Sequence, residues 1–177
     1  FNTSSANYLD VFLIASASDL TQTATSGYFV RLGGTDDEIS LYRKDGATLV
    51  KIIDGADGSL NQSASTIRLK ITRNAANQWQ LNRTVNAAAQ TTEGVVTDAT
   101  YNSTAFFGVS VKQSTASFFQ KHFIDDIIVS NYVPDVTAPD VLSYTVTGSN
   151  SLDLLFNEPL EEISAETIAN YSVSNGI

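Results

Sequence analysis

The residues best suited to chemistry in this sequence are two adjacent carboxylates inside an apolar stretch. Asp125 and Asp126 interrupt the run FIDDIIV, which otherwise consists of residues typical of a protein core. Because an unpaired carboxylate is very costly to bury, at least one must be exposed, hydrogen-bonded or bound to a cation. One interpretation is a structural Ca²⁺ site at Asp126, with Asp125 a weaker ligand. The other is a carboxylate that accepts backbone N–H bonds at a sheet end or bulge.

Aromatic side chains near amides give a second kind of candidate site. Trp79 lies in the run QWQLNR, and Tyr42 and Tyr101 are further aromatic residues in strand-like or loop-like surroundings. Binding sites for small molecules combine apolar or aromatic surface with a few placed polar groups, and sugar sites follow this pattern. A lone Trp that alternates with Gln is also typical of the core of a β-sandwich. Trp79, Tyr42 and Tyr101 are therefore candidate carbohydrate contacts, and Trp79 has a core role as its alternative.

Catalytic residues in a usable arrangement are not indicated. A glycosidase needs two carboxylates facing each other across the scissile bond. The acidic clusters at residues 36–38, 125–126 and 158–162 do not have the Glu-x-Asp-x-x-Glu spacing of sandwich glycosidases. His122 is the only histidine, and no Gly-x-Ser-x-Gly string is present. We expect no enzymatic activity in this chain.

Charge and composition exclude several classes of function. The chain has 19 acidic against 10 basic residues and a formal net charge of −9, which would repel the phosphate backbone of a nucleic acid. The absence of cysteine excludes disulfides, thiolate chemistry and Cys-ligated zinc. No apolar run is long enough to insert into a membrane. We therefore expect no nucleic-acid partner and no direct membrane insertion.

The elements that would position these residues read as short strands separated by turn signals. Alternation of apolar and polar residues predicts strands, whereas helix signals of adequate length are missing. In the first expected strand Asp10 is the one interruption, and residues 86–98 are undecided. Such spacing is typical of an antiparallel β-sandwich, and we predict an all-β fold. The strands expected up to this point are residues 8–15, 27–32, 38–43, 48–54, 66–73 and 78–82.

The stretch from residue 105 to 129 is expected to complete the sheets. Phe107, Val109 and Val111 repeat at every second position, which predicts a strand with one apolar face. Residues 113–117 are small and polar, as in a connecting loop. Residues 118–129 are apolar on both faces, which predicts a strand buried in the middle of the sandwich.

Two prolines mark a change of domain. Pro134 and Pro139 lie in the run NYVPDVTAP, which is typical of an extended linker. We assign residues 1–133 to the sandwich, 134–140 to a linker and 141–177 to the first part of a second β-domain. The second part is too short to bury a core alone. It is expected to contain two strands, a helical turn near residues 164–169 and a further strand near 171–174.

Several runs resemble a known family. NYLDVFLIA, SGYFVRLGGTDDEISLYRKDG, IRLKITRN, WQL, FFGVSVKQST and FIDDIIV are similar, in this order, to the concanavalin/laminin-G-like (jelly-roll) sandwich of secreted multidomain proteins of Bacteroidetes. The resemblance covers about residues 4–133 and implies one or more opening strands before Phe1. Residues 137–139 (TAP), 154–159 (LLFNEP) and Asn170-Tyr171 resemble the start of bacterial Ig-like modules of surface-layer and adhesin proteins.

The resemblance implies a non-catalytic module of a secreted or cell-surface protein. Such a module would bind carbohydrate, mediate adhesion or act as a spacer, with polysaccharide or a cell-surface protein as its partner. Proteins of this kind often carry a lamin-tail domain and a type IX secretion signal, and they lie on the extracellular face of the outer membrane. Two alternatives stay open: an accessory domain of a large secreted hydrolase, and a structural subunit docked on an outer-membrane complex.

Overall fold

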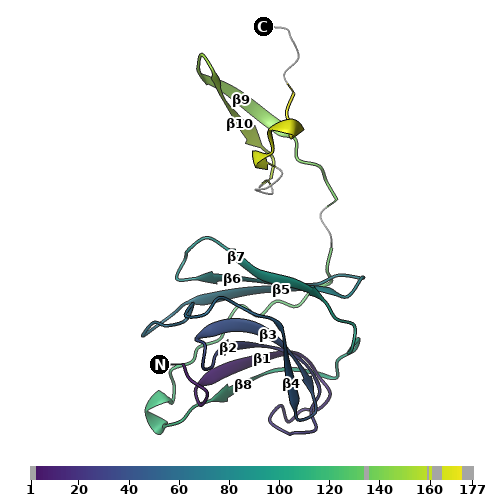
Figure 1. Cartoon of the computed structure of the whole chain (residues 1–177), viewed down its shortest axis with the longest axis vertical. Coiled ribbons are helices and arrows are strands. Elements are labelled where there is room, and N and C mark those ends of the chain that lie inside the picture. Colours follow the sequence, from purple (N-terminus) through teal and green to yellow (C-terminus); the bar gives the residue numbers. More distant parts are fainter. Residues whose placement is uncertain (1–2, 134–135, 159, 161–164, 173–177) are drawn as a thin grey trace. The chain divides into compact units, whose positions relative to one another are not determined.

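The computed structural model is all-β and describes residues 3–133, 136–158, 160 and 165–172. Its strands form antiparallel sheets of five, three and two strands, and none of these sheets closes into a barrel. The chain divides into two compact units, Phe1–Tyr132 and Val133–Ile177. The first unit contains the five-stranded and the three-stranded sheets (Figure 1), and the second contains the remaining two strands.

The five-stranded sheet has the order β4-β3-β2-β1-β8. Strands β1 to β4 pair in succession along the chain, as β1–β2, β2–β3 and β3–β4, and the tight turn at Gly46 (φ 63°) sets the register of the last pair. Strand β8 returns from the other sheet to pair with β1. The strands are β1 (Tyr8–Ala15), β2 (Gly27–Gly33), β3 (Glu38–Asp45), β4 (Thr48–Ile53) and β8 (Phe106–Lys112).

The three-stranded sheet has the order β5-β6-β7, with β5 at Ile67–Arg73, β6 at Gln78–Val85 and β7 at Thr91–Thr97. Strand β7 falls within the residues that the sequence left undecided. It is rich in Thr and Val, which suit a pleated and partly exposed strand.

The main core lies between these two sheets. Side chains alternate along each strand, so Tyr28 and Val30 of β2 and Ile39 and Leu41 of β3 face the three-stranded sheet. There they meet Trp79 and Leu81 of β6 in one buried cluster. The opposite side chains of β1, β2 and β3 form a second face, which we call the outer face: Tyr8, Asp10, Phe12, Phe29, Arg31, Glu38, Ser40 and Tyr42.

The predicted buried strand at residues 118–129 is wrong. A short 3-10 helix, η1 (Ala116–Phe118), follows β8, and residues 119–133 form no strand. Phe123 is 90% exposed and Ile128 is 84% exposed. Asp126 has a φ of 51°, which lies outside the strand region. Two successive carboxylates would place one charge on each face of a strand, and a strand buried on both faces cannot hold either charge unpaired.

The second unit contains an antiparallel hairpin of β9 (Val141–Gly148) and β10 (Ser151–Phe156). A short 3-10 helix, η2 (Ile168–Asn170), lies near the expected helical turn. Residues 161–164 and 173–177, where parts of the expected turn and third strand fall, lie outside the described residues. Among the residues that the structure describes, no helix is long and apolar enough to cross a membrane.

Candidate functional site

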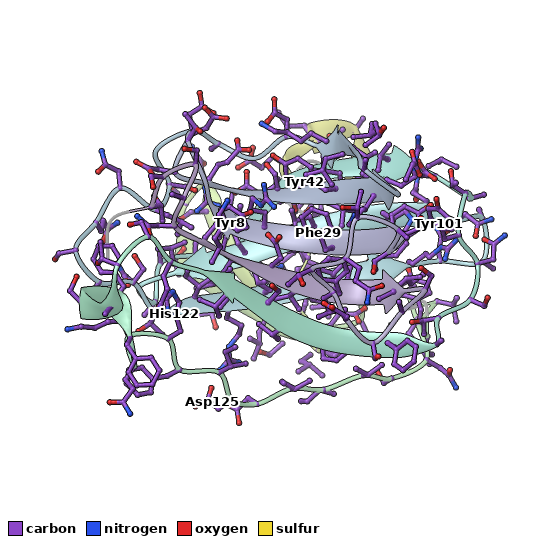
Figure 2. All side chains as sticks on the ribbon, turned by 90° about the horizontal axis from the view of Figure 1, so that it is seen from below. Tyr8, Phe29, Tyr42, Tyr101, His122 and Asp125 are labelled. Atoms are coloured by element: carbon purple, nitrogen blue, oxygen red, sulfur yellow. The ribbon has the colours of Figure 1, made fainter. Side chains whose placement is uncertain are left out.

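A row of stacked aromatic rings crosses the outer face of the five-stranded sheet. Phe12 lies directly opposite Phe29, which in turn lies opposite Tyr42, so three neighbouring strands place their rings at one level. The Phe12 and Phe29 centroids are 4.9 Å apart, and those of Phe29 and Tyr42 are 5.2 Å apart with ring planes at 5°. Figure 2 shows Tyr8, Phe29 and Tyr42 near one another on this sheet. The row is a consequence of strand register.

Arg31 lies above the aromatic row and is held in place by a buried carboxylate. Its Nε and Nη2 each donate to one oxygen of Asp10 at 2.8 Å, and the two residues are direct cross-strand partners. Its guanidinium carbon lies 3.8 Å from the Tyr8 ring centroid and 5.4 Å from that of Tyr42. Burial alone would lower the pKa of Arg31, but the hydrogen bonds and charge of Asp10 raise it above its ordinary value. The guanidinium is therefore a fixed cation.

A pocket of about 180 Å³ opens beside this arginine. Tyr8, Arg31, Asp36, Glu38 and Tyr42 supply its large side chains, and we call it the sheet pocket. Its rim includes the turn Gly33-Gly34, where φ is 95° and 99°. Such positive φ values favour glycine. Burial raises the pKa of the Tyr42 hydroxyl, which stays protonated at neutral pH and can both donate and accept a hydrogen bond.

Glu38 is the most deeply buried acid of the sheet pocket, at 2% exposed. Its Oε1 accepts hydrogen bonds from the Ser40 hydroxyl and from Lys51 Nζ, both at 2.7 Å. Its Oε2 is buried and accepts no hydrogen bond from the described residues. Buried acceptors are nearly always satisfied, so this oxygen marks a place for a further donor.

Lys51 lies among three carboxylates beside the pocket. Its Nζ is 2.6 Å from Asp54, 2.7 Å from Glu38 and 3.6 Å from Asp36. The hydrogen bonds that its ammonium donates to Asp54 and Glu38 raise the pKa of Lys51 well above its ordinary range. The ammonium is committed to these acids, so it is not a free cation for a ligand.

The arrangement is suited to binding. Aromatic rings offer apolar faces, while Arg31, Asp36, Glu38 and the Tyr42 hydroxyl offer hydrogen-bonding groups of both kinds. In the described part of the chain, no group of three or more His, Cys, Asp or Glu side chains could hold a metal ion.

The structure places the three aromatic candidates in different surroundings. Tyr42 lines the sheet pocket. Trp79 is 3% exposed, packs on Tyr28 with centroids 4.7 Å apart and donates its Nε1–H to the Asp98 carbonyl at 3.0 Å. Tyr101 packs against the main core and donates its hydroxyl to Asp45 at 2.9 Å. Trp79 and Tyr101 are therefore left out of the proposed site.

The two candidate metal ligands, Asp125 and Asp126, lie in the exposed segment after η1. Both are exposed, and Asp126 has a positive φ of 51°. Figure 2 shows Asp125 and His122 away from the labelled rings of the outer face. Burial lowers the pKa of His122. The structure brings neither aspartate into the sheet pocket.

Sequence reasoning missed Tyr8, Arg31, Asp36 and Glu38 as members of one site. The signal was present in the outward positions of three successive strands, which read Tyr8-x-Asp10-x-Phe12, Phe29-x-Arg31 and Glu38-x-Ser40-x-Tyr42. The aromatic residues in this pattern have a structural reason as well, because Phe12 and Phe29 are 2% and 1% exposed and form a second buried cluster with Ala15, against which Leu20 and Tyr42 pack.

Comparison with protein-family models, with curated proteins and with solved structures finds no match.

Proposed function

We propose that this chain is a non-catalytic carbohydrate-binding module of a secreted or cell-surface multidomain protein, with the sheet pocket as its sugar site. One observation carries the proposal: two tyrosine side chains, a fixed guanidinium and the carboxylates of Asp36 and Glu38 line one pocket of about 180 Å³ on the five-stranded sheet. Binding groups that are already held in place lose little conformational entropy when a ligand arrives.

Sugar chemistry suits this combination. A pyranose presents C–H groups on its faces and hydroxyls around its edge, so it needs both aromatic surface and hydrogen-bond partners. Tyr42 supplies the aromatic surface, Tyr8 adds a ring of which one face is already covered by the Arg31 guanidinium at 3.8 Å, and Arg31 and Glu38 supply a donor and an acceptor. The pocket contains no nucleophile paired with a base, which favours binding over reaction.

The finer fold assignment belongs to the same proposal. Antiparallel sheets of five and three strands around one core support a concanavalin/laminin-G-like sandwich in the first unit, and the β9–β10 hairpin supports the start of an Ig-like module. A protein of this kind would lie on the extracellular face of the outer membrane. Its partners would be polysaccharide and the further domains of its own polypeptide.

Affinity electrophoresis in gels containing plant, algal and bacterial polysaccharides tests the proposal. We expect at least one polysaccharide to retard the chain, and we expect Tyr42→Ala to reduce that retardation about tenfold or more, since a stacking ring and a hydroxyl are lost together. Tyr144→Ala is the matched control, because Tyr144 is 72% exposed on β9 of the other unit. Migration unchanged by every polysaccharide would overturn the proposal.

A docked structural subunit is the second candidate, favoured by the exposed apolar residues of the hairpin. Val141, Leu142, Val146, Leu152 and Leu155 are each about half exposed or more. A two-stranded hairpin is marginally stable alone, so such residues suit a protein partner. This function, or that of an accessory domain of a hydrolase, would replace the first if no polysaccharide binds.

A further inference from the structure

We propose that the sheet pocket selects neutral sugar units and rejects units that carry a carboxylate or a sulfate. This inference rests on the proposed carbohydrate binding and adds the substrate class. It follows from the balance of charges around the pocket and from the ion pairs that Arg31 and Lys51 already form with carboxylates.

Negative charge exceeds positive charge around the pocket. Asp36 and Glu38 line it, Asp10 lies behind Arg31, and Asp54 contacts Lys51. These four carboxylates face three cations: Arg31, Lys51 and Lys112, whose Nζ lies 5.4 Å from the Tyr8 ring centroid. An anionic sugar would therefore enter a region of net negative charge, and the formal net charge of −9 on the whole chain adds to the repulsion.

Arg31 and Lys51 are both already paired with carboxylates, so neither is free to bind an incoming anion. Two nitrogens of Arg31 are bound to both oxygens of Asp10, at 2.8 Å each. The Lys51 ammonium contacts Asp36, Glu38 and Asp54. A ligand carboxylate or sulfate would have to displace one of these carboxylates, which would leave a charge without its partner. The remaining guanidinium nitrogen, Nη1 of Arg31, suits a single hydroxyl oxygen rather than a bidentate acid.

The buried Oε2 of Glu38 has no hydrogen-bond donor among the described residues. The residue as a whole is only 2% exposed. The oxygen is buried, so a sugar hydroxyl reaches it only after the Glu38 side chain turns toward the pocket, whereas an ionised carboxylate or sulfate group has only acceptors and cannot donate to it at all. Leaving a charged acceptor unsatisfied costs more than leaving a neutral one, so the preference for hydroxyls is built into the site.

The experiment compares polymers that share one backbone. Each neutral polysaccharide that retards the chain is paired with its carboxymethylated and sulfated derivatives, for example hydroxyethyl cellulose with carboxymethyl cellulose, or dextran with dextran sulfate. We expect the dissociation constant to rise at least about tenfold for the anionic partner at low salt, and the ratio to shrink as salt screens the charges.

Two variants assign the discrimination to the pocket. Glu38→Gln removes the buried charge. We expect it to lower severalfold the ratio of the dissociation constant for the anionic polymer to that for the neutral polymer. Asp153→Asn makes the same charge change on β10 of the other unit and should leave the ratio unchanged. Because Glu38 is buried and its loss could unfold the chain, Asp36→Asn provides a second variant at a half-exposed pocket position. A ratio equally lowered by Asp153→Asn would assign the effect to net charge and overturn the inference.

The two proposals fail in different ways. If no polysaccharide retards the chain, the proposed function is wrong and the inference falls with it. If neutral polymers bind and their anionic derivatives bind as tightly or more tightly, carbohydrate binding stands and the selectivity is overturned.

Discussion

At the scale of single residues, Asp98 hydrogen-bonds to side chains from both sheets of the first unit. Its side chain accepts hydrogen bonds from the Tyr28 hydroxyl, from Arg43 Nη1 and from the Thr100 backbone N–H. Its carbonyl accepts the Trp79 Nε1–H. Because Tyr28 belongs to the five-stranded sheet and Trp79 to the three-stranded sheet, Asp98 links the two layers at the edge of the core.

Acid should weaken the first unit through Asp98. Burial by itself raises the pKa of Asp98, but hydrogen bonds from Tyr28, Thr100 and Arg43 outweigh it and lower the pKa from its ordinary value of 3.8 to about 2. A folded-state pKa below the unfolded-state value contributes stability that is complete above 3.8 and is lost as the pH falls through about 2. Urea titrations of wild type and Asp98→Asn should therefore differ most near neutral pH and converge toward pH 2. A constant difference would contradict this role.

Trp79 and Tyr42 should respond to truncation in opposite ways. We expect Trp79→Ala to lower the free energy of unfolding by about 3–5 kcal/mol, as large core truncations do. Trp79 is 3% exposed, so its ring is lost from the interior. Tyr42→Ala should cost less stability and should reduce polysaccharide binding instead. Denaturant unfolding and affinity electrophoresis on both variants separate the two effects. Loss of binding in Trp79→Ala without loss of stability would contradict the core role.

The candidate site was only partly predictable at this scale. Tyr42 could be selected as an aromatic residue on an expected strand, although its packing on Phe29 could not be foreseen. Arg31, Asp36 and Glu38 could not be joined to it, since their proximity depends on which strands are neighbours and in what register. Asp10 looked like an interruption of a strand, and only its cross-strand pairing with Arg31 gives it a role.

At the scale of elements, hairpins were the most predictable part of the fold. The Asp45-Gly46 turn and the alternation of residues 38–43 indicated β3 and β4 directly, and both form. The stretch after β8 was not predictable in the same way. Its apolar residues match a strand pattern, but that pattern takes no account of two successive charges, and Asp126 has a φ of 51° that a strand does not allow.

The exposed segment after η1 should be the first place where trypsin cuts. Lys121 is exposed there and is the last Lys or Arg in the chain, so cleavage removes residues 122–177. Arg68, Lys70 and Arg83 lie in paired strands and should resist, because proteases need an extended, locally unfolded substrate. Mass spectrometry of a brief digest identifies the first fragment, and Lys121→Gln should delay it. First cleavage within β5 or β6 would contradict the exposure of this segment.

At the scale of the whole molecule, the two units differ in how much apolar surface each buries. The first unit has a buried cluster between two sheets, with residues such as Tyr28, Ile39 and Leu81 fully inside. The second unit has a hairpin whose apolar residues are largely exposed. The chain divides into these units after Tyr132, whereas the sequence assignment of residues 1–133, 134–140 and 141–177 to a sandwich, a linker and a second domain stays a prediction.

The first unit should therefore carry the stability of the chain. We expect a fragment of residues 1–132 to melt within a few degrees of the full chain in differential scanning calorimetry, because the hairpin contributes little buried apolar area of its own. A fragment of residues 133–177 should show no cooperative transition, which near-ultraviolet circular dichroism of Tyr144 and Tyr171 can follow. A large drop in melting temperature for residues 1–132 would mean that the two units stabilise each other. Retained polysaccharide binding by the same fragment would assign the site to the first unit, which contains every residue that lines the sheet pocket.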